Sequence, residues 1–231
     1  STQANATNWR AVEFWANQGV KRVILAREVT LDEIKEIKKK LGNKIELEYF
    51  IHGAMCMAYS GRCILSKWMT GRSANLGDCA QPCRWKYHQK GDVYKLSMED
   101  DLKKVRMNVE EDLHGTYFFN SYDLNLIEHV GKLIDAGIDC LKIEGRAKSV
   151  YYVAIVSRAY RKVLNAIEEK VSKKELKKII FAQKEELENL ANRGYTEGFL
   201  FGNNPGHNFE GREKKFEAYQ FVGEIEVEEN G

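Results

Sequence analysis

Several features that would assign this chain to a common class of protein are missing from its sequence. There is no apolar run of about eighteen residues, so no membrane-spanning helix is expected. The first residues have neither the basic nor the apolar region of a signal peptide. Only two prolines occur in 231 residues, and the chain is 43% hydrophobic and 30% charged, as in globular proteins with a substantial core. We therefore expect a soluble, cytoplasmic protein.

The common catalytic signatures are missing as well. The sequence contains no H-E-x-x-H zinc motif and no G-x-S-x-G nucleophile elbow. No glycine-rich phosphate turn follows a predicted strand, and the five histidines are scattered. The net charge of +2 excludes little. Five cysteines without an export signal favour a reducing compartment over a disulfide scaffold.

Helices and short apolar strands alternate along most of the chain, which predicts an α/β fold with a parallel sheet. The expected strands cover residues 21–26, 45–51, 116–120 and 139–144. The expected helices cover residues 8–18, 31–41, 121–137, 149–169 and 173–193, the third capped by Ser121. A complete eight-stranded α/β barrel needs about 250 residues. The chain should therefore form about the second half of a TIM-like barrel; a small doubly wound sheet is the alternative.

The domain organisation follows from this pattern. We expect residues 1–202 to form the partial α/β barrel, interrupted by a Cys-rich insertion at 53–95. Residues 203–231 are expected to be a linker and the first strand, at 216–227, of a truncated C-terminal β-domain. The chain has no initiator Met, and a half barrel has exposed strand edges. We therefore expect the N-terminal half of the barrel to be supplied by the same or another chain.

The insertion contains four of the five cysteines. Cys56, Cys63, Cys79 and Cys83 are separated by six, fifteen and three residues. Four thiolates suit tetrahedral zinc or an iron–sulfur cluster, and zinc sites usually pair two close knuckles. Only one close pair is present, so the spacing favours a [4Fe-4S] cluster, with zinc and four free cysteines left as alternatives. Cys140 is expected in the core, with a reserve role as a ligand.

The same insertion is basic and rich in aromatic residues. Residues 62–95 contain seven Lys or Arg and only two acids. Trp68 and Trp85 lie in the same stretch. Cations interleaved with aromatic rings can hold phosphates and stack on bases, although a solvated loop would have a similar composition. The candidate RNA-binding residues are Arg62, Lys67, Arg72, Arg84 and Lys86.

Polar residues follow the predicted strands, where active residues of α/β barrels lie. The candidate substrate-binding residues are Gln3, Asn5, Arg27 and Arg146, and the candidate catalytic residues are Glu144, His52 and Lys142. The strand at 139–144 should turn Cys140, Lys142 and Glu144 towards the interior. Buried charges need partners, so Lys142 and Glu144 could form a structural ion pair with each other, or an ion pair with Glu46 or Glu48. The other interpretation is a pocket for a small anionic substrate, bound by Lys142 and Arg146, with Glu144 as acid or base.

His52 and Cys56 also allow a different kind of chemistry. They are four residues apart at a predicted strand end, so they could form the nucleophile and base of a peptidase. That interpretation leaves three neighbouring cysteines without a role.

Several segments resemble one known family. HGAMCMAYSGRCILS, at residues 52–66, is similar to the signature of the U32, collagenase-like peptidase family. EEDLHGTYFFNSYDL, LKIEGRAKSVYYVA and RGYTEGF resemble segments of a branch that hydroxylates tRNA. The resemblance extends over most of residues 1–202, and motifs this long and ordered are specific for the family.

The resemblance implies a fold, a cofactor and a reaction. The fold is an α/β barrel followed by a small β-domain. The cofactor is a [4Fe-4S] cluster on Cys56, Cys63, Cys79 and Cys83, with Cys140 as a substitute for Cys83. The reaction is the oxygen-independent conversion of the tRNA wobble uridine to 5-hydroxyuridine, with prephenate as the hydroxyl source. Hydroxylation of ribosomal RNA or of a ubiquinone precursor, and peptidase activity, are the alternatives that the family offers.

Overall fold

A computed structural model describes residues 2–56, 58–84, 97–99, 106–108, 110–112, 115–117, 121–146 and 148–202. Its helices are α1 (Trp9–Asn17), α2 (Leu31–Leu41), α3 (Leu65–Thr70), α4 (Val130–Asp135), α5 (Val150–Glu168) and α6 (Lys173–Glu188). Short 3-10 turns are η1 (Thr2–Ala4), η2 (Ala74–Leu76), η3 (Pro82–Arg84) and η4 (Ile127–His129). No helix in this part of the chain is long and apolar enough to cross a membrane.

The strands form one main sheet and two small ribbons. They are β1 (Arg22–Ile24), β2 (Glu46–Ala54), β3 (Ser97–Glu99), β4 (Arg106–Asn108), β5 (Glu110–Asp112), β6 (Gly115–Tyr117), β7 (Asp123–Asn125), β8 (Cys140–Ile143) and β9 (Tyr195–Thr196). In the main sheet, β2 is the central strand and pairs in parallel with β1 and β8. β7 pairs antiparallel with the end of β2, and β9 runs parallel to β7. The α/β class is confirmed. The sheet is open among the described residues, and the barrel stays a prediction.

The expectation of an all-parallel sheet is wrong at β7. Its residue Asp123 pairs with Ala54, the last residue of β2. The chain leaves the main sheet at the end of β2 and returns to the same end, so β7 can only run back along its neighbour. The predicted strand at 116–120 is also wrong in its place: β6 covers Gly115–Tyr117 and pairs with β5, outside the main sheet.

The helix expected to begin at Ser121 begins later, at Val130, after η4. The Ser121 hydroxyl does not cap a helix but donates a hydrogen bond to the Met55 carbonyl oxygen at 2.8 Å. That bond connects the start of β7 to the end of β2. Long-range pairing therefore takes precedence over the local capping signal at this position.

α2 shows how local sequence determines an element. Thr30 and Glu33 form a reciprocal capping box, with the Glu33 carboxylate accepting from the Thr30 amide at 2.7 Å. Four apolar residues at helical spacing are buried, namely Leu31, Ile34, Ile37 and Leu41, and Gly42 follows as the C-cap. The helix covers the predicted range of 31–41.

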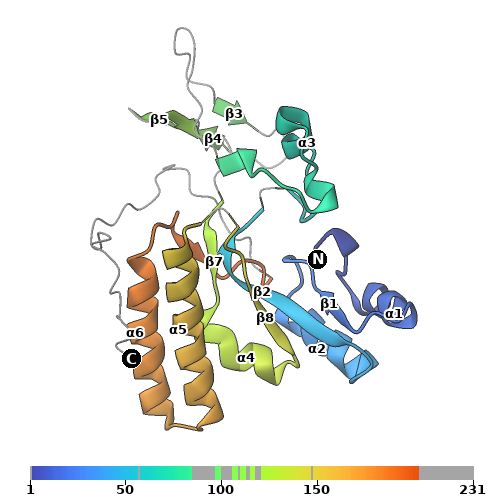
Figure 1. Ribbon diagram of the computed structural model, residues 1–231, viewed down its shortest axis with the longest axis vertical. Coiled ribbons are helices and arrows are strands. Elements are labelled where there is room, and N and C mark those ends of the chain that lie inside the picture. The colour runs from blue at the N-terminus through green and yellow to red at the C-terminus, as the bar shows by residue number, and fades with distance from the viewer. Residues whose placement is uncertain are drawn as a thin grey trace, which may run out of the picture.

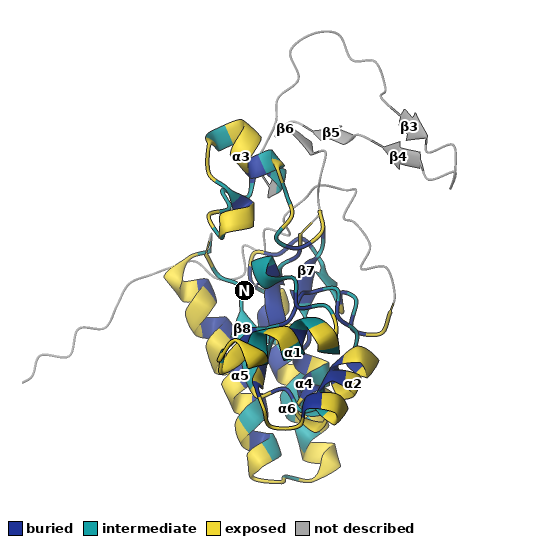
Figure 2. Cartoon of the chain, turned by 90° about the vertical axis from the view of Figure 1, so that its right-hand side faces the viewer, coloured by how far each residue is buried: buried dark blue, intermediate teal, exposed yellow. Residues whose placement is uncertain are grey.

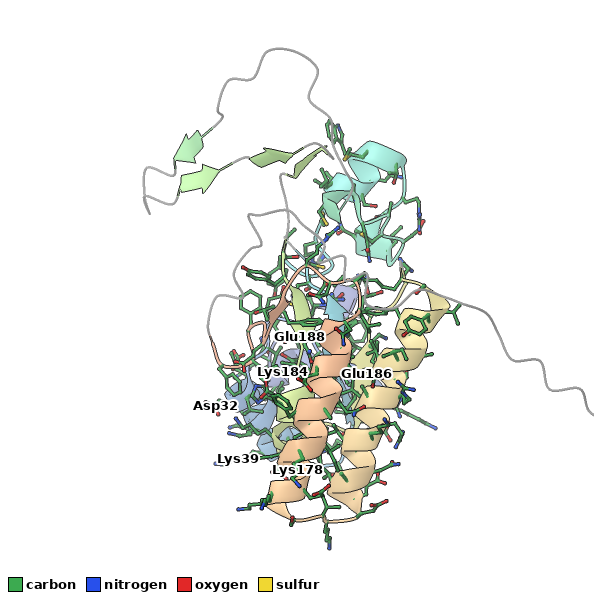
Figure 3. All side chains as sticks on the ribbon, turned by 90° about the vertical axis from the view of Figure 1, so that its left-hand side faces the viewer. Asp32, Lys39, Lys178, Lys184, Glu186 and Glu188 are labelled. Carbon is green, nitrogen blue, oxygen red and sulfur yellow. The ribbon has the colours of Figure 1, made fainter. Side chains whose placement is uncertain are left out.

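The helices flank the main sheet. Figure 1 shows α5 and α6 side by side on one side of the sheet and α1 and α2 on the other. Their inner faces are buried and their outer faces exposed, as Figure 2 shows. Charged residues such as Lys178, Lys184 and Glu186 are spaced along α6 (Figure 3), and Glu186 pairs with Arg158 of α5. One continuous apolar core joins helices and sheet.

Of the remaining sequence predictions, the tail strand at 216–227 lies outside the described residues, and nothing in the fold tests the domain boundaries.

Candidate functional site

A cavity of about 680 Å³ lies where β1, β2 and β8 end and the Cys-rich segment begins. Its wall contains all four cysteines of the segment together with four charged side chains. Lys142 belongs to β8, and Arg27, Glu144 and Arg146 follow strands. The C-terminal ends of parallel strands meet at one edge of a sheet, which is why residues far apart in the sequence gather here.

Two tethers hold the Cys-rich segment over this edge. The Ser60 amide donates to the Glu28 carboxylate at 2.8 Å, and the Gln3 side chain donates to the Ala74 carbonyl oxygen at 3.3 Å. Gly61 lies so close to the backbone of Gln3 that an added Cβ would come within 2.9 Å of it. Sequence analysis missed Ser60 and Gly61, since only the folded chain brings the segment to the N-terminus.

Ser66 organises the interior of the segment. It is fully buried in α3; its hydroxyl donates to the Arg72 carbonyl oxygen at 2.8 Å and accepts from the Ala80 amide at 3.0 Å. Arg72 also donates twice to one Asp78 carboxylate oxygen, at 2.8 and 2.9 Å. These bonds fold the chain back so that Cys79 lies on the same cavity as Cys56 and Cys63.

The cysteine sulfurs share the cavity and receive hydrogen bonds within it. Arg27 Nη1 donates to Cys56 Sγ at 3.6 Å, and the Gln81 amide donates to Cys79 Sγ at 3.3 Å. All five cysteines are free thiols. Within the described ranges, no three Cys, His, Asp or Glu side chains are grouped closely enough to hold a metal ion as they stand. Four thiols on one cavity, two of them accepting N–H hydrogen bonds, fit the donor set of an iron–sulfur cluster.

The two candidates for the fourth ligand lie in different places. Cys83 lines the cavity, whereas Cys140 is not among the lining residues. Cys140 lies further back along β8, opposite Glu48. Burial, together with the Glu48 carboxylate, raises the pKa of its thiol.

Arg27 bridges several groups of the cavity wall. Only 8% exposed, it lies with its guanidinium carbon 3.9 Å from the centroid of the Phe50 ring. Its Nη1 reaches Cys56, and its Nη2 lies 3.7 Å from the Glu144 carboxylate. It therefore connects the ends of β1, β2 and β8.

Lys142 and Arg146 add two further cations to the wall. Lys142 Nζ donates to Glu48 at 3.0 Å, which is one of the ion pairs expected from the sequence. Arg146 donates to the Cys79 carbonyl oxygen at 3.4 Å, and its backbone amide donates to the Glu144 carboxylate at 3.0 Å. Four cations (Arg27, Arg62, Lys142 and Arg146) and a single acid (Glu144) line the cavity, a charge balance that favours an anionic ligand.

His52 does not reach the cavity. It is fully buried and packs against Tyr152, Tyr160 and Tyr195, with ring centroids 5.4 to 5.9 Å away. Burial lowers the pKa of its imidazole to about 4. β2 continues to Ala54, and its register with β8 shifts between Phe50 and His52. The side chains of Phe50 and His52 therefore do not share a face of the sheet.

The expected position of His52 at a strand end is wrong, because His52 lies within β2. His52 is not among the residues that line the cavity with Cys56, and its catalytic role stays a prediction. Asn5 is also absent from the cavity wall, while Gln3 lines it.

The candidate RNA-binding residues are only partly described. Arg62 lines the cavity, Lys67 extends from α3 to the Gly71 carbonyl oxygen at 3.0 Å, and Arg72 is bound to Asp78. Next to Lys67, the Trp68 side chain is 79% exposed. The side chain of Arg84 and the whole of Lys86 lie outside the described residues.

Comparison with known proteins defines the family. Residues 1–209 match the model of peptidase family U32, and the chain belongs to this family. It is similar to tRNA hydroxylation protein P1 of Bacillus subtilis, with 45% identity over 96% of this chain and 50% of the relative. It is also similar to tRNA hydroxylation protein P of Escherichia coli, with 41% identity over 100% of this chain and 57% of the relative.

A third relative has a different name. The collagenase of Porphyromonas gingivalis is 34% identical over 89% of this chain and 48% of that protein. The chain thus spans about half the length of the curated relatives it matches. No solved structure matches it.

Proposed function

We propose that the chain provides the cluster-binding and substrate-binding part of an oxygen-independent RNA hydroxylase acting on the wobble uridine of tRNA. One observation carries the proposal: four cysteines and an excess of cations line a single cavity at the strand ends. The names of the similar proteins from B. subtilis and E. coli support the substrate. The proposal includes the fold implied by the family, in which this sheet is part of an α/β barrel that residues outside this chain complete.

The proposed cofactor is a [4Fe-4S] cluster held by Cys56, Cys63, Cys79 and Cys83. Replacing C–H by C–OH at uridine C5 is a two-electron oxidation, so without oxygen it needs a redox group and another source of the hydroxyl. A cluster would supply the redox chemistry, and prephenate is the proposed hydroxyl source. As a small dianion, prephenate suits the positive wall of the cavity.

The protein residues have separate proposed roles. Arg146 and Lys142 bind the anionic substrate, and Glu144 accepts or donates a proton beside them. Arg62 and Lys67 hold RNA phosphates at the rim, and Trp68 stacks on an unpaired base. Only a splayed-out base could enter the cavity, as with other enzymes that modify bases.

A peptidase is the second candidate, because the family name and the P. gingivalis relative favour it. A cysteine nucleophile needs a base within hydrogen-bond reach. Among the described residues, no histidine lines the cavity that contains Cys56. The geometry therefore favours hydroxylation.

The test is the nucleoside content of tRNA. Cells that lack the full-length protein should lose 5-hydroxyuridine from tRNA; the wild-type gene should restore it, and a Glu144→Gln variant should not. A Lys178→Gln variant, changed on the outer surface of α6, is the matched control and should restore it fully. Normal 5-hydroxyuridine in the deleted strain would exclude this function and favour ribosomal RNA or a ubiquinone precursor as substrate.

A further inference from the structure

Arg27 is a buried cation in the wall of the cavity. It follows β1, and 8% of its surface is exposed. A guanidinium removed from water is costly unless its charge and its donors are matched by partners. Its contacts must therefore account for its place in the cavity wall.

The partners of Arg27 lie around its planar guanidinium group. The Phe50 ring covers the guanidinium face at 3.9 Å, as in a cation–π interaction. One terminal nitrogen, Nη1, donates to Cys56 Sγ at 3.6 Å, and the other, Nη2, lies 3.7 Å from Glu144 Oε2. The guanidinium group is planar and rigid, so with one nitrogen at the Cys56 sulfur and the other near the Glu144 carboxylate it fixes the distance between these two groups.

The two groups that Arg27 joins have no other short connection along the chain. Cys56 follows β2 and Glu144 follows β8, so they lie 88 positions apart in the sequence, the difference between their numbers. The strands bring them to one cavity, but their side chains need a third group to set their relative position. Gly53 helps by allowing the Glu144 backbone to approach β2, since a Cβ there would lie 2.2 Å from the Glu144 carbonyl oxygen.

We infer that Arg27 is a positioning residue that couples the cluster ligand Cys56 to the acid–base group Glu144 and donates a hydrogen bond to the ligand sulfur. The inference rests on the proposed function for the identity of the cluster. Hydrogen bonds to ligand sulfurs and nearby charge set the reduction potential of such clusters. A cation and a donor at Cys56 stabilise the reduced, more negative form. Arg27 therefore raises the potential, and it does so from a place where it also restrains Glu144.

The coupling can be tested without a cluster. Arg27→Gln, Glu144→Gln and the double variant form a double-mutant cycle with the wild-type chain. The stability of each cluster-free protein is compared through its midpoint of urea unfolding. We expect non-additivity: once Arg27 is replaced, the change at Glu144 should have a smaller effect. The same cycle with the exposed Arg161 of α5 in place of Arg27 is the control and should be additive. Additive shifts in the Arg27 cycle would overturn the coupling.

The effect on the sulfur is tested by redox titration of the cluster-loaded protein, prepared without oxygen and checked for iron. Arg27→Gln should shift the reduction potential to more negative values, and Arg27→Lys should recover part of the shift. Lys142→Met is the matched control, because it removes a cavity cation that donates its hydrogen bond to Glu48 and not to a ligand sulfur. Its shift should be smaller. An unchanged potential in Arg27→Gln, or an equal shift in Lys142→Met, would contradict the inference.

The two levels of the proposal fail in different ways. Wild-type protein without iron would contradict the proposed cofactor, while the stability cycle would still decide the Arg27–Glu144 coupling. A loaded wild-type protein whose potential is independent of Arg27 would leave the proposed function standing and remove the positioning role at the sulfur.

Discussion

Among single residues, the buried imidazole of His52 connects stability to pH. Burial lowers its folded pKa to about 4, against about 6.5 in the unfolded chain. The unfolded chain therefore takes up a proton between these values while the folded chain does not. Stability from this group is complete above about pH 6.5 and declines towards pH 4, by on the order of 3 kcal/mol.

Urea unfolding at a series of pH values measures this effect. The stability of His52→Leu should fall less steeply than that of the wild-type chain between pH 6.5 and 4. Parallel profiles for the two proteins would contradict the assignment.

Tyr160 connects three parts of the core through one hydroxyl. It is fully buried, donates to the Ile51 carbonyl oxygen at 2.8 Å and accepts from the Leu126 amide at 3.1 Å. Tyr160→Phe removes the hydroxyl and leaves its two buried backbone partners without it. We therefore expect a loss of roughly 1–3 kcal/mol in unfolding free energy. Tyr151→Phe, half exposed on the same helix, should change little. Equal stabilities of the two variants would show that the hydroxyl is not a significant link.

Individual site residues differed in how far the sequence could locate them. Arg27, Glu144 and Arg146 were identified because parallel strands end at one edge, a rule that needs only strand positions. His52 was misplaced, because the register shift after Phe50 depends on pairing with β8, which local alternation does not encode. The bond between Arg27 and Cys56 joins two loops, and no sequence pattern predicts it.

At the scale of elements, Gly53 permits the close approach of β2 and the residue after β8. Its φ is +105°, and an added Cβ would lie 2.2 Å from the Glu144 carbonyl oxygen. Gly53→Ala should lower the unfolding free energy by more than the roughly 1–2 kcal/mol that a positive φ alone costs. Gly19→Ala is the control, since its φ is +81° and nothing lies within 4 Å of the added Cβ. Equal losses in the two variants would mean that the backbone contact is unimportant.

α3 presents a large aromatic side chain to solvent. Trp68 is 79% exposed beside Lys67, and stacking on a base contributes roughly 1–3 kcal/mol. Trp68→Ala should therefore weaken binding of an anticodon stem-loop about tenfold or more, measured by fluorescence anisotropy. Phe181→Ala, 62% exposed on α6, is the control and should bind normally. Undiminished binding by Trp68→Ala would exclude α3 from the RNA surface.

Elements with complete local signals were predicted well. α2 has a capping box, an apolar stripe and a terminal glycine, all readable within a dozen residues. β7 has three residues, and its direction follows from the excursion that precedes it, so its place could not be deduced locally. Elements held by distant partners were the ones the sequence misassigned.

For the whole molecule, the relevant fact is that the chain spans about half the length of its curated relatives. The cavity nevertheless collects its wall from the N-terminal turn, three strand ends and the Cys-rich segment of this one chain. We therefore expect this chain to bind the cluster by itself, and the complete reaction to need the full-length protein.

The most direct test of this account is the iron and acid-labile sulfide content of the chain purified without oxygen. The account predicts about four of each per chain, with a broad visible absorption. Cys56→Ala should lose them, and Cys140→Ser, changed outside the cavity, should keep them. Stoichiometric zinc in place of iron, or a cluster that survives in Cys56→Ala and disappears in Cys140→Ser, would contradict it.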